Sequence, residues 1–317
     1  MRDVVIIGGG LSGLAAAWEL EQSGVSYTLI EVKPRLGGSI HTVRVNGFCF
    51  DSGPMAHHLT NPSGFEAYLV RLGLSEQVTV TDDGRLAFIH GTHTLVETLA
   101  AQITAPVMRR MAVSTLGIME PDRYSICLEN GMLLDARALI VAAPARYAER
   151  MFYTLTPEIS HQLLDYRYDT ITRISAGYTG PGYADLNVMY PPDAPIADTS
   201  RLTHPARLPD AGGAIVQAAL RIEPGEMPQD PVGELAALMR WPLNPDADHI
   251  ATWTESDPVM WRMTDHIRRM TTIRALLPQG VALAGSDYVH SDGPPRLDER
   301  VQQGQTAADR VLAYLRR

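Results

Sequence analysis

The sequence is poor in lysine: Lys33 is the only lysine among 27 basic residues, and no run of basic residues occurs. The 36 acidic residues give the chain a net charge of −9 at pH 7. Binding to a nucleic acid or to an anionic lipid surface relies on clustered positive charge. Its absence argues against a nucleic-acid partner, and we expect a small-molecule substrate instead.

Cysteine is equally scarce. Cys49 and Cys127 stand far apart and form no C-x-x-C motif, so the sequence favours neither a disulfide framework nor a zinc site. No H-E-x-x-H spacing or similar metal-binding pattern occurs, and we expect no metal. Such sparing use of cysteine fits the reducing cytoplasm.

Long apolar runs are also missing, because no segment reaches the roughly 18–20 residues needed to cross a membrane. The apolar N-terminal stretch is interrupted by the glycines at 8–10, and the amphipathic pattern that follows carries Glu19 and Glu21. A signal peptide does not have this pattern. We therefore expect a soluble cytoplasmic protein without a transmembrane segment.

The chain is long enough for a substantial core. Its 317 residues, 45% of them hydrophobic, favour one large domain or two intertwined domains. Residues 3–7 form a β-branched run typical of a buried parallel strand, residues 14–24 have helical periodicity ending at Gly24, and residues 26–31 are predicted as a second strand. The chain therefore begins with a β-α-β unit.

Later segments carry weaker but readable signals. The other predicted elements are a hairpin turning at Asn46-Gly47, helices at 63–74 and 94–103, several short strands between 107 and 143, a strand composition at 281–287 and a helix at 298–317.

The turn between the first strand and the first helix carries Gly8, Gly10 and Gly13 in a G-x-G-x-x-G pattern. In this context the glycines permit a tight turn, close approach of backbone to a pyrophosphate, and packing of helix on strand. Glu31 ends the second strand about 20 residues later, where a carboxylate can bind a ribose 2′-hydroxyl. The pattern predicts a dinucleotide site that disfavours NADP, and both NAD and FAD fit it.

The segment after Glu31 separates these two cofactors. "VKPRLGGSIHT" places Arg35 beside Gly37 and Gly38, which gives one fixed positive charge next to backbone that can approach a phosphate closely. Together with "GGGLSGL" and "GFCFDSGP", this segment resembles the flavin-containing amine oxidase and protoporphyrinogen oxidase superfamily. The resemblance implies FAD, with its phosphates wrapped by the R-x-G-G segment.

The same resemblance extends to "PVMRRMAV", "ALIVAAPARYAERM" and "VALAGSDYV" with "RLDERVQQGQTAADRVL". It implies that Val113 contacts the adenine and that Asp287 holds ribityl or phosphate-side groups. The residues expected at the cofactor, from the glycine motif and from the resemblance, are Gly8, Gly10, Leu11, Ser12, Gly13, Glu31, Val32, Arg35, Gly37, Gly38, Ser39, Gly53, Pro54, Met55, Val113, Ala142, Ala143, Pro144, Gly285, Ser286, Asp287, Leu297 and Asp298.

The implied fold is α/β: a Rossmann-like FAD-binding domain interleaved with a smaller substrate domain that carries a mixed or antiparallel sheet. We expect the FAD-binding domain to comprise residues 1–42, 91–148 and 280–317. We expect the substrate domain to comprise residues 43–90 and 149–279.

Three departures from the superfamily bear on function. The large helical insertion that typically covers the substrate is missing, so the site is expected to be small or open, or completed by a second subunit in a homo-oligomer. Glu299 and Arg300 replace the small residues usual at the start of the last helix; their side chains either point to solvent or alter the flavin's surroundings. Arg173 replaces a lysine that many amine oxidases hold near flavin N5, and a guanidinium cannot act as a base.

The catalytic residue is therefore not fixed by the sequence. The candidates are His57, His58, Arg173 and Trp253. Trp253, Trp261, Tyr178 and Tyr288 could form an aromatic wall, although we expect at least half of them to be core residues. His266 is expected to be structural, and neither Cys49 nor a histidine is marked as a covalent attachment point for the flavin.

The leading hypothesis is an FAD-dependent oxidoreductase that accepts a hydride at flavin N5 from a small organic substrate. Three alternatives stay open: a renalase-like oxidase of dihydronicotinamides, a non-catalytic FAD-binding protein, and a non-redox flavin isomerase acting on a sugar nucleotide. The first is motivated by the chain length and the second by the missing lid and by Glu299-Arg300. The substrate and the electron acceptor are left undetermined.

Overall fold

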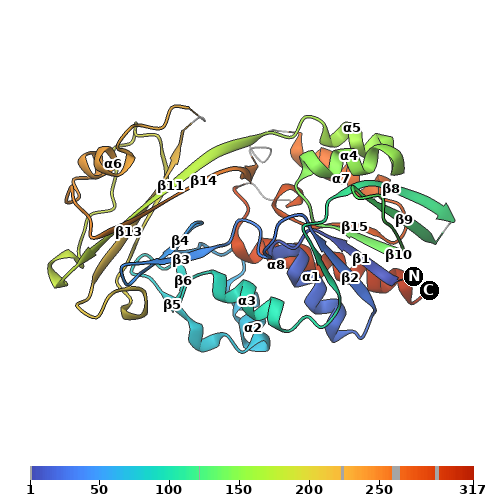
Figure 1. Ribbon diagram of the computed structural model, residues 1–317, viewed down its shortest axis with the longest axis horizontal. Helices are drawn as coiled ribbons and strands as arrows, with labels where there is room; N and C mark the ends of the chain where they lie inside the picture. Colours follow the sequence, from blue (N-terminus) through green and yellow to red (C-terminus); the bar gives the residue numbers. More distant parts are fainter. Residues whose placement is uncertain (1, 121, 223–224, 259–264, 290–292) are drawn as a thin grey trace. The chain divides into compact units, whose positions relative to one another are not determined.

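The computed structural model describes residues 2–120, 122–222, 225–258, 265–289 and 293–317 (Figure 1). The contacts divide the chain into two compact units. Unit 1 comprises Met1–Gly38, Val96–Tyr168 and Pro258–Arg317, and unit 2 comprises Ser39–Leu95 and Asp169–Asp257. Each unit is therefore assembled from segments that are far apart in the sequence.

Unit 1 is built on a seven-stranded sheet with the order β7-β2-β1-β10-β9-β8, in which β15 also pairs with β10. The strands are β1 (Arg2–Ile7), β2 (Tyr27–Glu31), β7 (Val107–Arg109), β8 (Val113–Glu120), β9 (Arg123–Leu128), β10 (Leu133–Val141) and β15 (Val281–Leu283). β1, β2, β7, β10 and β15 run parallel, whereas β8, β9 and β10 form an antiparallel meander. The carboxyl ends of the parallel strands β1, β2 and β10 thus share one edge of the sheet.

Helices complete unit 1. They are α1 (Leu11–Gln22), α4 (Ala145–Leu155), α5 (Pro157–Leu163), α7 (His266–Leu276) and α8 (Leu297–Leu315). One core cluster joins Val5 and Val141 of the sheet to Phe152, Ile159 and Ile273 of α4, α5 and α7. α8 packs along α1, where Gln305 Nε2 donates to Glu19 Oε1 at 2.8 Å. The last helix of the chain therefore completes the packing of the first.

Unit 2 contains a four-stranded sheet with the order β12-β13-β11-β14. Its strands are β11 (Tyr168–Thr179), β12 (Ile196–Leu202), β13 (Gly213–Arg221) and β14 (Ala247–Pro258), and two hairpins are formed by β3 (Thr42–Val45) with β4 (Phe48–Asp51) and by β5 (Val78–Val80) with β6 (Leu86–Phe88). The helices are α2 (Pro62–Leu72), α6 (Pro231–Met239) and α3 (His93–Ala101), of which α3 continues into unit 1.

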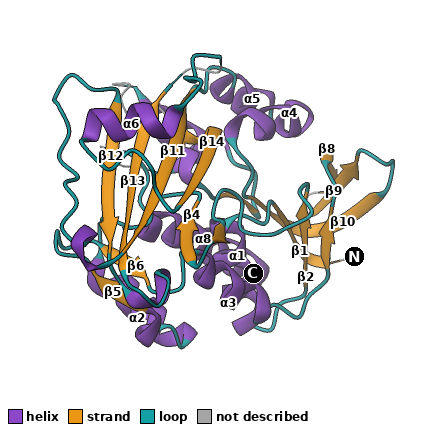
Figure 2. Ribbon diagram, turned by 60° about the vertical axis from the view of Figure 1, so that its left-hand side comes forward, coloured by secondary structure: helices purple, strands orange, loops and turns teal. Residues whose placement is uncertain are grey.

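The two faces of the unit 2 sheet are buried differently. α6 packs on one face through Leu235 and Met239, against Ile174 and Val216 (Figure 2). The β3–β4 hairpin places Phe48 and Phe50 in a second cluster with sheet residues of the other face, such as Ile215. Successive residues of a strand point to opposite faces of a sheet, and here the residues on both faces are apolar. The sheet is therefore a central layer of unit 2.

The predicted fold class is confirmed: a Rossmann-like α/β unit is accompanied by a separate sheet-containing unit. The hairpin does turn at Asn46-Gly47, where both residues have positive φ (50° and 84°), as a tight hairpin turn requires. In the predicted strand composition at 281–287, only Val281–Leu283 is a strand. Residues Ser286–Tyr288 form a 3₁₀ turn after Gly285, whose φ of +137° interrupts the extended chain.

The contact-defined units differ in extent from the expected domains. Helices α5 and α7 and the larger part of α4 lie within residues expected in the substrate domain, yet they bury their apolar faces against the sheet of unit 1. Which unit binds which part of a ligand stays a prediction.

Candidate cofactor site

The glycine turn that follows β1 brings three segments of unit 1 together. Gly8 N donates to Ile30 O of β2 at 2.8 Å, and Gly8 has a φ of +109°. A Cβ on Gly8 would lie 2.5 Å from the carbonyl oxygen of Ala142, and a Cβ on Gly13 would overlap the carbonyl oxygen of Gly8. The glycines are thus required for the close approach of the turn to the end of β10.

The N-terminus of α1 is left open by its own side chains. Gly10 is the N-cap residue, no side chain caps the helix, and its first turn contains no acidic residue. Leu11 and Ser12 are buried there. Uncapped amides and the positive end of a helix dipole suit a phosphate group, so this turn fits a dinucleotide diphosphate.

Glu31 is hydrogen-bonded to the glycine turn. Its carboxylate is buried and accepts hydrogen bonds from Gly9 N and Lys33 N, both at 2.7 Å. Because Glu31 ends β2, its carboxylate lies at the carboxyl edge of the sheet, as the sequence pattern predicted.

The R-x-G-G loop folds back on the same turn. Gly37 N donates to Gly9 O at 2.8 Å, and a Cβ on Gly38 would lie 3.3 Å from the Cα of Gly10. Arg35 Nη2 donates to Gly38 O at 2.8 Å. Burial lowers the pKa of the half-buried Arg35 guanidinium although the charge of Glu31 opposes the shift, and an arginine nonetheless remains cationic. The loop therefore places one cation and two glycines against the glycine turn.

The other predicted residues of unit 1 lie at the ends of strands and helices. Val113 is buried at the start of β8, Ala142 to Pro144 follow β10, and Leu297 and Asp298 are buried in the first turn of α8. Val32 is exposed, and Gly285 and Ser286 follow β15. The structure brings the residues after β1, β2 and β10 to one sheet edge, which is the edge where ligands of such sheets bind.

Asp287 accepts hydrogen bonds from residues that the sequence did not indicate as its partners. Its Oδ2 accepts from Ala145 N, at the start of α4, at 2.6 Å and from the hydroxyl of Tyr168. Burial and the charge of Asp287 raise the pKa of Tyr168, so this hydroxyl stays a donor. Asp287 thereby fixes α4 and the start of β11.

Glu299 is buried rather than directed to solvent. Its Oε2 accepts from Arg296 N at 2.8 Å, which caps the start of α8. This residue therefore stabilises the helix. Of the two possibilities left open for Glu299, the structure excludes the one in which its side chain points to solvent, because the carboxylate is the acceptor for the amide of Arg296.

The candidate catalytic residues all lie in unit 2. Buried His57 has its Nε2 3.0 Å from Thr92 Oγ1, whereas His58 is exposed. Arg173 on β11 faces Asp198, with 4.0 Å between Nη1 and Oδ2. Trp253 Nε1 donates to Ser52 O at 2.8 Å.

Of the proposed aromatic wall, two tyrosines are core residues. Tyr178 belongs to the cluster under α6 and Tyr288 to the cluster under α4. Trp261 lies outside the described residues. Buried His266 has Nε2 3.0 Å from Val289 O, which fits the structural role expected for it.

Gly53, Pro54 and Met55 follow β4. β4 ends at Asp51, which is the centre of a buried polar network that the sequence did not reveal. The carboxylate of Asp51 is 1% exposed and accepts from Arg207 Nη2 at 2.8 Å, from Thr92 N at 3.0 Å and from Thr42 Oγ1 at 2.5 Å. Arg207 is fully buried and also donates to Phe88 O and Cys49 O. Arg207 lies 156 residues from Asp51, so no local pattern could have shown the pair.

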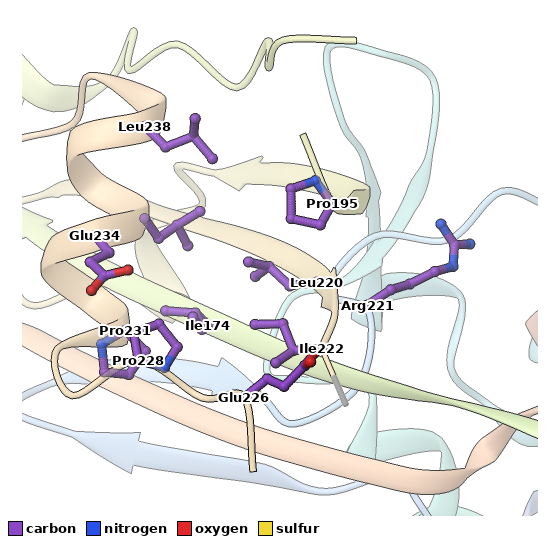
Figure 3. A pocket seen from close by; sticks show the side chains of 11 residues that line it. Ile174, Pro195, Leu220, Arg221, Ile222, Glu226, Pro228, Pro231, Glu234 and Leu238 are labelled. Carbon is purple, nitrogen blue, oxygen red and sulfur yellow. The ribbon is translucent and has the colours of Figure 1, made fainter. Parts of the chain in front are cut away.

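A pocket of about 450 Å³ lies between α6 and the unit 2 sheet (Figure 3). Its walls are mainly aliphatic side chains and prolines, including Leu220, Leu238 and Pro195, with Glu226, Glu234 and Arg221 as its charged residues. None of the predicted site residues lines it, and we do not assign it to the candidate site.

Metal, disulfide and membrane features were also searched. Within the described residues, no group of three or more His, Cys, Asp or Glu side chains could hold a metal ion. Cys49 and Cys127 are free thiols. The described helices include none with the length and apolar character needed to span a membrane.

Comparison with known proteins identifies the N-terminal part. Residues 6–72 match the family model of an NAD(P)-binding Rossmann-like domain. Coproporphyrinogen III oxidase of Propionibacterium freudenreichii is 35% identical over 82 residues, which cover 26% of this chain and 15% of that protein. The 4,4'-diapolycopene oxygenase of a Methylomonas species is 43% identical over 70 residues, which cover 22% of this chain and 14% of that protein. The matched segment thus spans only a small part of each relative.

Solved structures extend the likeness to the whole fold. A protein of Exiguobacterium sp. 255-15 assigned as a protoporphyrinogen oxidase has a TM-score of 0.77 at 14% identity, covering 100% of this chain and 99% of that one. A putrescine oxidase variant with a redesigned cofactor site has a TM-score of 0.80 at 15% identity, covering 98% and 99%. The chain is therefore similar in its N-terminal segment to an NAD(P)-binding Rossmann-like domain, and its fold is similar to the folds of these two oxidases. The resemblance predicted from the sequence is confirmed at that level.

Proposed function

We propose that this protein is an FAD-dependent oxidoreductase that oxidises a small organic substrate. The observation that carries the proposal is the closed arrangement of the Gly8–Gly13 turn, Glu31 and the R-x-G-G loop at one sheet edge. Bound FAD would supply the hydride-accepting chemistry, at flavin N5. The relatives named as oxidases and oxygenases support this class of reaction.

In this proposal, unit 1 binds the adenosine and diphosphate. The open amides at the start of α1 and the Arg35 guanidinium would hold the phosphates, and Glu31 would accept from the ribose hydroxyls. Val113 would contact the adenine. We assign Gly53 to Met55 to contacts with the cofactor as well, and the rest of unit 2 to substrate binding.

The same geometry favours FAD over a nicotinamide coenzyme. A second glycine-rich loop with its own cation, Arg35, lies against the first turn, whereas a simple Rossmann site requires only the turn and the acid. The absence of any lysine other than Lys33 argues against a lysine-assisted amine oxidation. A renalase-like oxidation of dihydronicotinamides and a non-catalytic FAD-binding role are therefore the competing proposals.

An anaerobic reduction panel would test the function. Purified protein would be loaded with FAD and mixed in turn with primary amines, reduced porphyrinogens and dihydronicotinamide isomers. The proposal expects bleaching of the flavin by one of these classes, and bleaching by dihydronicotinamides alone would select the renalase-like alternative. Bleaching by dithionite only would contradict an oxidoreductase function.

A further inference from the structure

The turn between β10 and α4, which comprises Ala142 to Pro144, packs directly against the glycine turn. Ala142 N donates to Ile7 O at 2.7 Å. A Cβ on Gly8 would lie 2.5 Å from the carbonyl oxygen of Ala142, and a Cβ on Gly13 would lie 3.3 Å from the Cβ of Ala142. Because the two turns are in such close contact, a shift of the β10–α4 turn would displace the glycine turn as well.

The first amide of α4 finds its acceptor in a distant segment. Pro144 is the N-cap residue and supplies no side-chain cap, and Ala145 is fully buried, so its amide needs an acceptor within the protein. Asp287 Oδ2, in the 3₁₀ turn after β15, accepts from Ala145 N at 2.6 Å. The carboxylate of Asp287 therefore caps α4 from a position 142 residues further along the chain.

Tyr288, the next residue, holds the same turn. Its hydroxyl donates to Ala143 O at 2.9 Å, and the residue is 2% exposed. Burial and the charge of Asp287 raise the pKa of Tyr288, so the hydroxyl keeps its proton and remains a donor. The backbone of this pair is anchored as well. Asp287 O accepts from the Tyr166 hydroxyl at 2.9 Å, and Tyr288 O accepts from Arg274 Nη2 at 3.2 Å.

We propose that Asp287 and Tyr288 are positioning residues, which hold the β10–α4 turn, and through it the glycine turn, in the arrangement that binds the diphosphate. All of these residues belong to unit 1. The inference rests on the proposed function, because that function brings the diphosphate to the glycine turn. It differs from the role that the superfamily resemblance implies for Asp287, in which the carboxylate holds the cofactor itself. In the structure, Oδ2 accepts from Ala145 N and from the Tyr168 hydroxyl.

The chain offers a matched pair of buried tyrosines for the test. Tyr288→Phe removes a hydroxyl donor to the Ala143 carbonyl, and Tyr178→Phe removes a hydroxyl donor to the Pro242 carbonyl of unit 2, at 2.7 Å. Both changes lose one hydrogen bond to a backbone carbonyl. In separate titrations with FAD and with ADP, we expect Tyr288→Phe to weaken the binding of both ligands about fivefold and Tyr178→Phe to leave both unchanged. Equal affinities in the two variants would overturn the inference.

The two ligands also separate positioning from direct contact at Asp287. ADP contains the adenosine and the diphosphate of FAD but lacks the ribityl chain and the flavin. Asp287→Ala should therefore weaken the binding of ADP and of FAD to the same extent. Asp287→Asn should restore much of both affinities, because the amide oxygen can still accept from Ala145 N. A loss confined to FAD would mean that Asp287 contacts the ribityl side directly, and it would overturn the positioning role.

A third measurement needs no ligand. In the ligand-free full chain, amide hydrogen exchange of the peptide containing Ala143 and Ala145 should accelerate in Asp287→Ala and return towards the wild-type rate in Asp287→Asn. Unchanged exchange in Asp287→Ala would overturn the anchoring of the β10–α4 turn. A wild-type protein that binds neither FAD nor ADP would instead overturn the proposed function, and with it the ligand part of this inference.

Discussion

At the scale of single residues, the candidate site depends on glycines, because a Cβ atom at these positions would collide with neighbouring backbone. Gly8 and Gly13 leave room for the end of β10 and for the turn itself, and Gly38 leaves room for Gly10. The only guanidinium in this cradle among the described contacts belongs to Arg35, which curls over the loop to reach Gly38 O. Its charge is the feature that distinguishes a phosphate site from a merely tight turn.

Replacing Arg35 by alanine should therefore weaken FAD binding by about 10- to 100-fold, because a charge-assisted contact to the diphosphate is lost. Isothermal titration with FAD measures the change. Lys33→Ala is the matched control: it removes an exposed positive charge from the same loop and should change the affinity less than about threefold. Equal losses in the two variants would mean that only general electrostatic attraction acts at this loop.

Residues of the site were predictable where their partners are close in sequence. Gly8, Gly13, Glu31 and Arg35 all lie within one β-α-β unit and its following loop, whose spacing is dictated by the phosphate geometry. Asp51 has its decisive partner in Arg207, and such a distant pair leaves no periodic or local signal. The role of His57 was likewise hidden, because its bond to Thr92 depends on how the β6 region folds back.

At the scale of elements, α8 packs against α1, the helix that begins at the glycine turn, and thereby holds this helix in place. A Cβ on Gly304 of α8 would overlap the carbonyl oxygen of Ser12 and would lie 2.8 Å from the Cβ of Ala15. This close approach explains a glycine in the middle of a 19-residue helix, where glycine normally lowers helix stability.

Gly304→Ala should thus destabilise the protein by about 1–3 kcal/mol through overpacking, although the same change in an exposed helix would stabilise it by about 1 kcal/mol. Urea denaturation monitored by circular dichroism gives the difference. Gln302→Ala, on an exposed position of the same helix, should stay within about 0.5 kcal/mol of the wild type. A stabilised Gly304→Ala variant would contradict the described packing.

The β3–β4 hairpin is tied into unit 2 by a buried charge. Arg207→Met should cost about 3–5 kcal/mol, since it leaves the Asp51 carboxylate buried without its cation. The comparison variant is Arg137→Met, whose ion pair with Asp3 spans 3.2 Å between partly exposed groups and should contribute less than about 1 kcal/mol. Adding Asp51→Asn to Arg207→Met should recover part of the loss, and the absence of any recovery would argue against the ion pair as the cause.

At the scale of the whole molecule, the chain passes back and forth between two units. Each unit is complete only when segments that are far apart in the sequence pack together. The first and last helices pack together in unit 1, while residues 39–95 and 169–257 make up unit 2. The α/β class and the Rossmann-like unit could be predicted because their signals lie at the N-terminus. The path of residues 149–168 could not be predicted. α4 and α5 belong to unit 1 because their apolar faces pack there, and their packing partners include α7, which lies about 110 residues away in the sequence.

The most direct test of the account is a titration of the cofactor-free protein with FAD and, separately, with NAD⁺. The account predicts that FAD binds with one equivalent per chain and develops the perturbed visible spectrum of a protein-bound flavin, while NAD⁺ neither binds nor displaces it. Saturable binding of NAD⁺ together with indifference to FAD would contradict the assignment of the glycine turn, Glu31 and Arg35 to a flavin dinucleotide.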